Sequence, residues 1–207
     1  MSFYEGARIV AAPLIRFIYG IKRLGIDNFP KNGPVIVCSN HRSNNDPLII
    51  GASMPREMKF MAKEELFKIP VLNFIIKLMG AFPVHRGKNN SEAVKTSIKI
   101  LNQGKVLAIF PEGTRQKQGG TPRPFKTGAA LFAYKTHAVV VPAAIITKGE
   151  VRPFKRNIVR IGEPLSFEDL GFTDGSAENL HAVSNFLHDK VAELLGESSN
   201  QGEKEIV

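Results

Sequence analysis

The chain is poor in the features that mark several classes of protein, beginning with cysteine. Cys38 is its only cysteine, which excludes an intramolecular disulfide framework and a cysteine-rich metal site and is compatible with a reducing compartment. No stretch reaches the roughly 18 uncharged apolar residues that a membrane-spanning helix requires. Residues 1–30 lack a small-residue cleavage site after their apolar run, so we expect no cleavable signal peptide.

Acidic residues are scarce in the first three quarters of the chain. Residues 1–162 carry 26 Lys and Arg against 9 Asp and Glu, whereas residues 163–207 carry 2 against 10. The basic region therefore favours an anionic partner, such as a membrane, a nucleic acid, a phosphorylated substrate or an acidic protein. We expect no nucleic-acid partner, because the sequence has no helix-turn-helix, zinc-finger or aromatic RNA-binding signature.

Residues 5–23 have the pattern of an amphipathic helix. Their charged and polar side chains fall within an arc of about 120° on a helical wheel, and the rest of the wheel is apolar. The members of that arc are Glu5, Arg8, Arg16, Tyr19, Lys22 and Arg23. A basic stripe opposite a broad apolar face is typical of a helix that lies in a membrane interface. A helix packed over the protein core is the alternative interpretation.

The remainder of the chain alternates between short apolar runs and longer periodic segments. The apolar runs predict strands at residues 35–38, 58–62, 106–110, 138–146 and 157–161. The periodic segments predict helices at residues 47–54, 71–79, 91–103, 127–136 and 176–196. This alternation predicts an α/β fold, a single domain with a mainly parallel central sheet covered by helices. We expect a membrane-interface segment at 1–28, the folded domain at 29–196 and a polar tail at 197–207.

His41 and Asp46 directly follow the first predicted strand, where α/β sheets place their ligands. A straight helix would point residues five apart about 140° away from each other. The sequence 43–47, Ser-Asn-Asn-Asp-Pro, favours a turn that brings them together, because Pro47 disfavours a helical conformation at Asp46. A carboxylate facing the imidazole would make His41 a general base worth about 10²–10⁴ in rate. An Asp46 that only caps the helix is the simpler alternative.

A second polar motif, Phe-Pro-Glu-Gly-Thr-Arg at residues 110–115, also follows a predicted strand. Gly113 would let backbone amides approach a ligand, and Arg115 offers a planar fork that matches a phosphate. Glu112 beside them is favourable only if it orients the arginine or accepts a hydrogen bond from a substrate hydroxyl. The motif thus indicates a substrate with a phosphate and a hydroxyl, and a surface turn with an incidental ion pair is the alternative.

Two weaker motifs complete the set. Arg86 lies at the end of Gly80–Gly87 and offers a second phosphate contact. Pro142 interrupts the strand at 138–146, which predicts an edge strand or a bulge, and the alanines after it leave room for an acyl chain or simply pack in the core. The remaining histidines have no ligand-like spacing, so we assign no metal.

Four motifs in this order resemble the glycerolipid acyltransferases. They are His-x-x-x-x-Asp at 41–46, Gly-x-x-x-x-x-Arg at 80–86, Phe-Pro-Glu-Gly-Thr-Arg at 110–115 and Val-Pro-Ala at 141–143. The resemblance spans residues 35–165 and implies the fold of that family. It also implies acyl transfer from a thioester of acyl carrier protein or coenzyme A to the sn-2 hydroxyl of 1-acylglycerol 3-phosphate, with no metal or redox cofactor.

The resemblance also assigns roles to particular residues. It implies that His41 is the general base, oriented by Asp46. It assigns the glycerol phosphate to a further set of residues: Lys63, Arg86, Glu112, Gly113, Thr114 and Arg115. It places the protein at an anionic membrane surface, on the cytoplasmic face of the cell membrane, in a peripheral or monotopic position. Another lysolipid or glycerol 3-phosphate as acceptor, or a non-catalytic lipid-binding protein of the same fold, are the alternatives.

Overall fold

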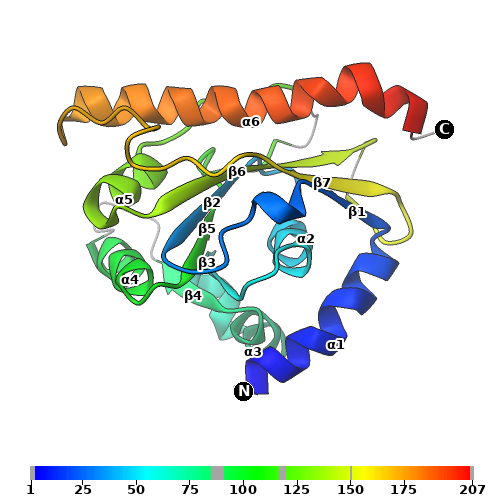
Figure 1. The fold of residues 1–207 in the computed structure, drawn as a ribbon. Coiled ribbons are helices and arrows are strands. Elements are labelled where there is room, and N and C mark those ends of the chain that lie inside the picture. Colours follow the sequence, from blue (N-terminus) through cyan, green and yellow to red (C-terminus); the bar gives the residue numbers. More distant parts are fainter. Residues whose placement is uncertain (1–2, 85–90, 117–119, 150, 206–207) are drawn as a thin grey trace.

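The computed structural model describes residues 3–84, 91–116, 120–149 and 151–205. In this part of the chain a seven-stranded sheet carries helices on both faces (Figure 1). The strands are β1 Ile21–Leu24, β2 Val35–Ser39, β3 Met58–Lys63, β4 Ala81–Val84, β5 Val106–Ile109, β6 Val139–Thr147 and β7 Asn157–Ile161. The α-helices are α1 Phe3–Ile18, α2 Asp46–Ser53, α3 Pro70–Leu78, α4 Ser91–Asn102, α5 Gly128–Thr136 and α6 Ala177–Glu205, and two 3₁₀ turns are η1 Ile26–Asn28 and η2 Glu64–Lys68.

The strands lie in the order β1-β7-β6-β2-β5-β3-β4, and β2 is at the centre. Every neighbouring pair is parallel except β6 and β7, which are antiparallel. The predicted class, an α/β fold with a mainly parallel sheet, is therefore confirmed. All the predicted strands are present, and each begins and ends within one or two residues of its predicted bounds.

The core lies in two layers, one on each face of the sheet. Val35 and Val37 of β2 pack with α2, whereas Ile36 and Cys38 pack with α4, α5 and α6. Successive side chains of a strand point to opposite faces, so a strand covered on both sides must be apolar throughout, as β2 is. Burial raises the pKa of the Cys38 thiol, which makes it a packing residue and a poor nucleophile.

Helix α1 ends earlier than the sequence predicts. We expected a helix over residues 5–23, but α1 stops at Ile18, Gly20 adopts a positive φ of 52°, and residues 21–24 form β1. Strand β1 pairs in parallel with β7 at the edge of the sheet. A four-residue strand carries too little periodicity to compete with a helical pattern, so its pairing partner decides its conformation. The first strand of the sheet therefore lies within residues 1–28, the segment that we had expected to precede the folded domain at 29–196.

The basic side chains of the amphipathic segment contact the protein, and apolar side chains of α1 face outward. Arg16 donates to the carbonyl oxygen of Ala52 and Arg23 of β1 to that of Ser53, both in the last turn of α2, where the helix dipole favours a cation. The apolar side instead faces outward, and the exposed fractions are 73% for Val10, 56% for Leu14 and 80% for Phe17. The predicted basic stripe thus binds the protein itself in part, and the apolar residues are free to bind something else.

Three further expectations need correction. Strand β4 was not predicted. Helix α6 continues to Glu205, beyond the predicted end at residue 196. Pro142 lies in the central strand β6 and not in an edge strand. The alternative expectation, a bulge, agrees with the pairing beside it: Val140 pairs with Leu165 and Ala143 with Ile161, which leaves one extra residue opposite Pro142. The alanines after Pro142 are fully buried in the core, which supports the packing interpretation over an acyl-chain site.

Among the described helices, none is long and apolar enough to cross a membrane.

Gly25, in the turn after β1, lies close to the backbone of Ile161, and substitution of this glycine tests that approach. Gly25 has a φ of 71°, and a Cβ added to it would lie 2.2 Å from the carbonyl oxygen of Ile161, whereas Gly33 has a φ of 77° and open space around it. We expect Gly33→Ala to cost about 1–2 kcal/mol of unfolding free energy for the backbone conformation alone. Gly25→Ala should cost a further ~1–3 kcal/mol for the overlap. Urea unfolding of both variants measures the difference, and equal losses would contradict the close approach.

Candidate active site

The two strongest sequence motifs lie side by side because β2 and β5 are parallel neighbours. His41 follows the carboxyl end of β2, and the 110–115 motif follows the carboxyl end of β5. A backbone hydrogen bond joins the two loops directly, since the amide of Gln116 donates to the carbonyl oxygen of His41 over 2.8 Å. The predicted site is therefore assembled at one edge of the sheet.

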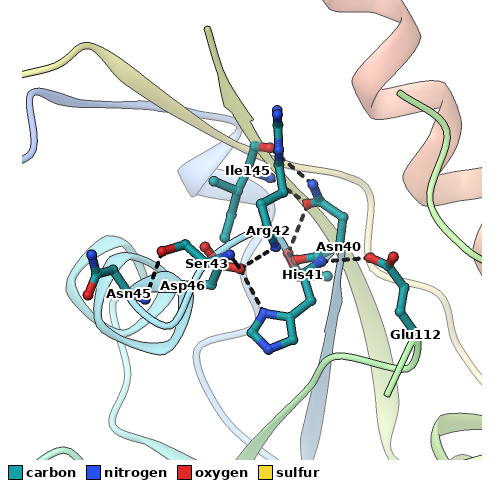
Figure 2. Close-up of polar contacts among 9 residues, drawn as sticks. Asn40, His41, Arg42, Ser43, Asn45, Asp46, Glu112 and Ile145 are labelled. Carbon is teal, nitrogen blue, oxygen red and sulfur yellow. Dashed lines mark hydrogen bonds and ion pairs between the residues drawn. The ribbon is translucent and has the colours of Figure 1, made fainter. Parts of the chain in front are cut away.

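Asp46 holds the His41 ring in one orientation. The Oδ2 atom of Asp46 lies 2.7 Å from Nδ1 of His41, and the Asp46 side chain is completely buried. Because a carboxylate only accepts hydrogen bonds, Nδ1 carries the proton and Nε2 keeps its lone pair. Figure 2 shows Nε2 turned away from Asp46, and no described residue hydrogen-bonds to it. The His41 side chain is 17% exposed, so this lone pair is accessible.

The turn that joins His41 to Asp46 is closed by the same carboxylate oxygen. Oδ2 of Asp46 also accepts the backbone N–H groups of Arg42 at 2.5 Å and Ser43 at 2.8 Å. Asp46 is the first residue of α2, one position earlier than predicted, and no side chain caps that helix by a hydrogen bond. Asp46 therefore closes the preceding turn and contacts His41, which differs from the capping role that we considered as the simpler alternative.

Three more side chains fix the position of His41. The amide of Asn40 forms two hydrogen bonds with the backbone of Ile145 in β6, at 2.8 and 3.1 Å. Oε1 of buried Glu112 accepts the backbone N–H of His41 at 2.7 Å (Figure 2). The ring of Phe110 stacks on the imidazole with 4.5 Å between centroids. The backbone and the plane of the His41 ring are therefore held from several directions.

Glu112 also anchors the segment after the 110–115 motif. Its Oε2 atom accepts the backbone N–H of Arg123 at 3.1 Å, and His188 of α6 contacts the carbonyl oxygen of neighbouring Pro122 at 2.9 Å. Burial lowers the pKa of His188, but hydrogen bonds to Asp189 and Pro122 outweigh it, so that its pKa is raised overall. The two oxygens of Glu112 thus join the His41 loop to the 120–124 segment.

A polar cavity of roughly 300 Å³ opens beside the His41 loop. It is bordered by Arg42, residues 43–45, Arg115, Gly149 and Val151. The Arg42 guanidinium donates to the carbonyl oxygens of Thr147 and Gly149, and its Nε–H is buried without a partner. Among the described residues no carboxylate forms an ion pair with Arg42 or Arg115. Two cations that border one cavity and pair with no carboxylate in the described ranges favour an anionic ligand there.

The other predicted binding residues have separate positions. Gly113 has a φ of 68° and lies under the side chain of Lys126, and Thr114 is exposed. Lys63 is exposed at the end of β3 and does not border the cavity. Arg86 lies outside the described residues. Of the predicted phosphate-binding residues within the described ranges, Arg115 alone borders the cavity. That part of the chain also contains no cluster of His, Cys, Asp and Glu able to hold a metal ion.

Sequence reasoning missed three residues of this site. Asn40 directly follows a buried strand, where a polar side chain must find hydrogen-bond partners, and that position was the available signal for its role. Phe110 lies in a motif that we singled out, but no pattern predicts a ring stacked on His41. Arg42 lies between His41 and the turn, and only the fold reveals that it reaches the β6–β7 connection.

Comparisons with known proteins identify the family of this chain. The family model described as acyltransferase matches residues 20–146. A 1-acyl-sn-glycerol-3-phosphate acyltransferase of Bacillus subtilis is 32% identical over 84% of this chain and 88% of its own length. A protein of the same name from Borreliella burgdorferi is 34% identical over 69% of this chain, which spans only 58% of that protein.

A solved structure has the same architecture. The crystal structure of the 1-acyl-sn-glycerophosphate acyltransferase PlsC from Thermotoga maritima superposes with a TM-score of 0.66 at 27% identity. The match covers 93% of this chain and 83% of the Thermotoga chain. The similarity therefore extends over most of the chain.

The double role of Glu112 predicts a loss of stability on a conservative change. Glu112→Gln keeps the shape but leaves one oxygen for two backbone N–H groups, and the new amide would face a donor. We expect a loss of about 1–3 kcal/mol in unfolding free energy. Exposed Glu163 provides the matched control, since Glu163→Gln should change it by less than about 0.5 kcal/mol. Indistinguishable urea midpoints for the two variants would show that Glu112 does not hold these loops.

Proposed function

The chain belongs to the acyltransferase family, and on that premise we propose that it transfers a fatty acyl group to the sn-2 hydroxyl of 1-acyl-sn-glycerol 3-phosphate, which yields phosphatidic acid. The names of the Bacillus and Borreliella relatives state this acceptor. The observation that carries the proposal is the His41–Asp46 pair beside a cavity bordered by Arg42 and Arg115. The cavity is bordered by Arg42, the residue after His41, so a base and an anion site on the same loop suit an acceptor that carries a hydroxyl and a phosphate.

In the proposed mechanism His41 acts as the general base. Its Nε2 atom takes the proton of the sn-2 hydroxyl while the hydroxyl oxygen attacks the carbonyl carbon of the acyl thioester. The carbon–sulfur bond then breaks, and the imidazolium returns its proton to the leaving thiolate. Asp46 keeps Nδ1 protonated and stabilises the imidazolium. The reaction needs no metal or redox cofactor to balance, and the thioester of acyl carrier protein or coenzyme A is the co-substrate.

The acceptor phosphate is proposed to bind at the Arg42–Arg115 cavity. Arg115 is exposed and has no described ion-pair partner, so its planar fork is available to a phosphate. Arg86, Lys63, Thr114 and Gly113 stay predicted contacts of the glycerol phosphate. Glu112 contributes chiefly by holding the backbone of His41, because both of its oxygens accept backbone N–H groups.

We propose further that α1 binds the anionic face of the cell membrane on its cytoplasmic side. Its outward residues Val10, Leu14 and Phe17 recur at helical spacing and are all exposed. Exposed apolar side chains along one helix face are costly in water and are stabilised by the apolar part of a bilayer. A peripheral protein docked this way would meet its lipid acceptor without extracting it into water.

Removal of the proposed base gives the first test of the mechanism. His41→Ala should lower kcat for acyl transfer by about 10²–10⁴, and Asp46→Asn should also lower kcat because Nδ1 loses its charged acceptor. The assay uses purified protein, 1-acylglycerol 3-phosphate and a palmitoyl or oleoyl thioester, with each donor in a separate series. If His41→Ala transferred acyl groups as fast as the wild type, the mechanism would be wrong. Transfer only to another lysolipid or to glycerol 3-phosphate would correct the acceptor.

Substitution of Arg115, with Arg123 as the control, tests the proposed phosphate site. Arg115→Ala should raise KM for 1-acylglycerol 3-phosphate by about 10-fold or more, since charged hydrogen bonds contribute about 1.5–3 kcal/mol. The KM for a monoacylglycerol, which has no phosphate, should be unchanged. Arg123→Ala is the matched control, because Arg123 is exposed nearby and only its backbone contacts Glu112. An equal KM for Arg115→Ala and the control would place the phosphate elsewhere.

A further inference from the structure

The connection between β6 and β7 carries an exposed phenylalanine in an unusual conformation. Phe154 is 84% exposed and has a φ of +60°. Bulky side chains rarely adopt a positive φ, because Cβ then crowds the following carbonyl group. The exposed ring therefore adds little packing to the isolated fold, and the positive φ is unfavourable for it. A phenylalanine in this position needs an explanation outside the packing of the protein.

Neighbouring residues make the tip of this connection basic. Val151 is buried, and the exposed residues 152–156 read Arg-Pro-Phe-Lys-Arg. No acidic residue occurs from 151 to 162. This segment, residues 151–156, is named the 151–156 loop below. An exposed ring flanked by cations matches a surface that is apolar inside and anionic outside, which is the arrangement of an anionic lipid leaflet.

The 151–156 loop is fixed to the end of α1. The backbone N–H of Phe154 donates to the carbonyl oxygen of Ile18 over 2.6 Å, and the side chain of Asn157 donates to the carbonyl oxygens of Tyr19 and Lys155. Figure 1 shows this turn, in yellow, beside the last turn of α1. Phe17, which is 80% exposed, is one residue from the joined backbone. Two exposed aromatic rings are thus carried by backbones that a hydrogen bond connects.

We propose that the 151–156 loop is a membrane anchor in its own right, beside α1. The Phe154 ring enters the boundary between headgroups and acyl chains, and Lys155 contacts the phosphates of anionic headgroups. The positive φ of Phe154 directs its side chain away from the protein, and the bonds to Ile18 and Asn157 hold the loop before it meets the bilayer. The proposal rests on the proposed function, which makes a lipid the substrate.

The same connection leads from the anchor to the proposed active site. Arg42 holds the carbonyl oxygens of Thr147 and Gly149, and Val151 borders the Arg42–Arg115 cavity. Only a few residues therefore separate the anchor from the cavity. Docking at Phe154 would bring the cavity to the height of the lipid headgroups, where the phosphate and sn-2 hydroxyl of the acceptor lie.

The absence of tryptophan from the chain allows a direct test. Phe154→Trp introduces the only tryptophan, and its fluorescence should shift to shorter wavelength with vesicles of phosphatidylglycerol and phosphatidylcholine. Lipids brominated on their acyl chains should quench it. Phe186→Trp is the matched control, because Phe186 lies on α6 over the opposite face of the sheet. Identical spectra of Phe154→Trp with and without vesicles would overturn the proposal.

Vesicle sedimentation measures what the anchor contributes. Phe154→Asn removes the ring and substitutes a residue that tolerates a positive φ, so folding should be kept and vesicle binding weakened by on the order of tenfold. Lys155→Gln should weaken binding to anionic vesicles about fivefold. Lys99→Gln on α4 should leave it unchanged, since Lys99 is exposed on the opposite layer. Wild-type vesicle binding by Phe154→Asn would refute the anchor. The anchor would also be refuted if the variant bound vesicles normally and lost only its affinity for acyl carrier protein.

A second measurement separates this proposal from the proposed function. Acyl transfer to a short-chain acceptor dispersed as monomers needs no bilayer, so Phe154→Asn should retain the wild-type rate there and lose rate on vesicles. If the wild type fails to transfer acyl groups in both formats, the proposed function is wrong whatever the vesicle binding. If transfer occurs but Phe154→Asn matches the wild type on vesicles, the anchor alone is wrong.

Discussion

The arrangement of the site depends on one buried oxygen atom. Oδ2 of Asp46 accepts hydrogen bonds from the imidazole of His41 and from the backbone N–H groups of Arg42 and Ser43. A fully buried carboxylate is unfavourable unless hydrogen bonds compensate its charge, and here Oδ2 accepts all three while Oδ1 is buried without a partner. The turn after β2 is therefore stabilised in the conformation that presents these three donors. Correct folding of the turn and correct orientation of His41 are the same event.

The contact between His41 and Asp46 was predicted correctly from the sequence for a physical reason. Pro47 and the polar residues before it limit the conformations of the chain, and the buried strand β2 fixes where the loop begins. The predicted strands were confirmed because runs such as 35–38 can be stable only when covered on both faces. What these patterns cannot provide is the partner of a backbone group, which is why Asn40 and the double role of Glu112 appeared only in the structure.

The errors have a common origin in tertiary pairing. Residues 21–24 continue the helical pattern of α1, yet they form β1 because β7 offers them a parallel edge. Pro142 reads as an edge-strand residue, yet it lies in central β6 because the pairing with β7 is interrupted on the side where its N–H is missing. In both cases the local sequence permits two conformations and a distant strand selects one. Local propensity is a weak predictor wherever such a partner exists.

Helix α2 connects the proposed active site to the proposed membrane-binding face of α1. Its first residue, Asp46, orients His41, and its last turn receives Arg16 of α1 and Arg23 of β1. The helix has eight residues, a length of about 12 Å. Because the arginines of the amphipathic segment turn inward to bind α2, the apolar residues of α1 turn outward. The interaction that fixes α1 to the domain therefore also exposes Val10, Leu14 and Phe17, and it does so about one short helix away from the base. A lipid-facing surface and a catalytic pair at this separation suit a reaction whose acceptor hydroxyl stays at the membrane surface.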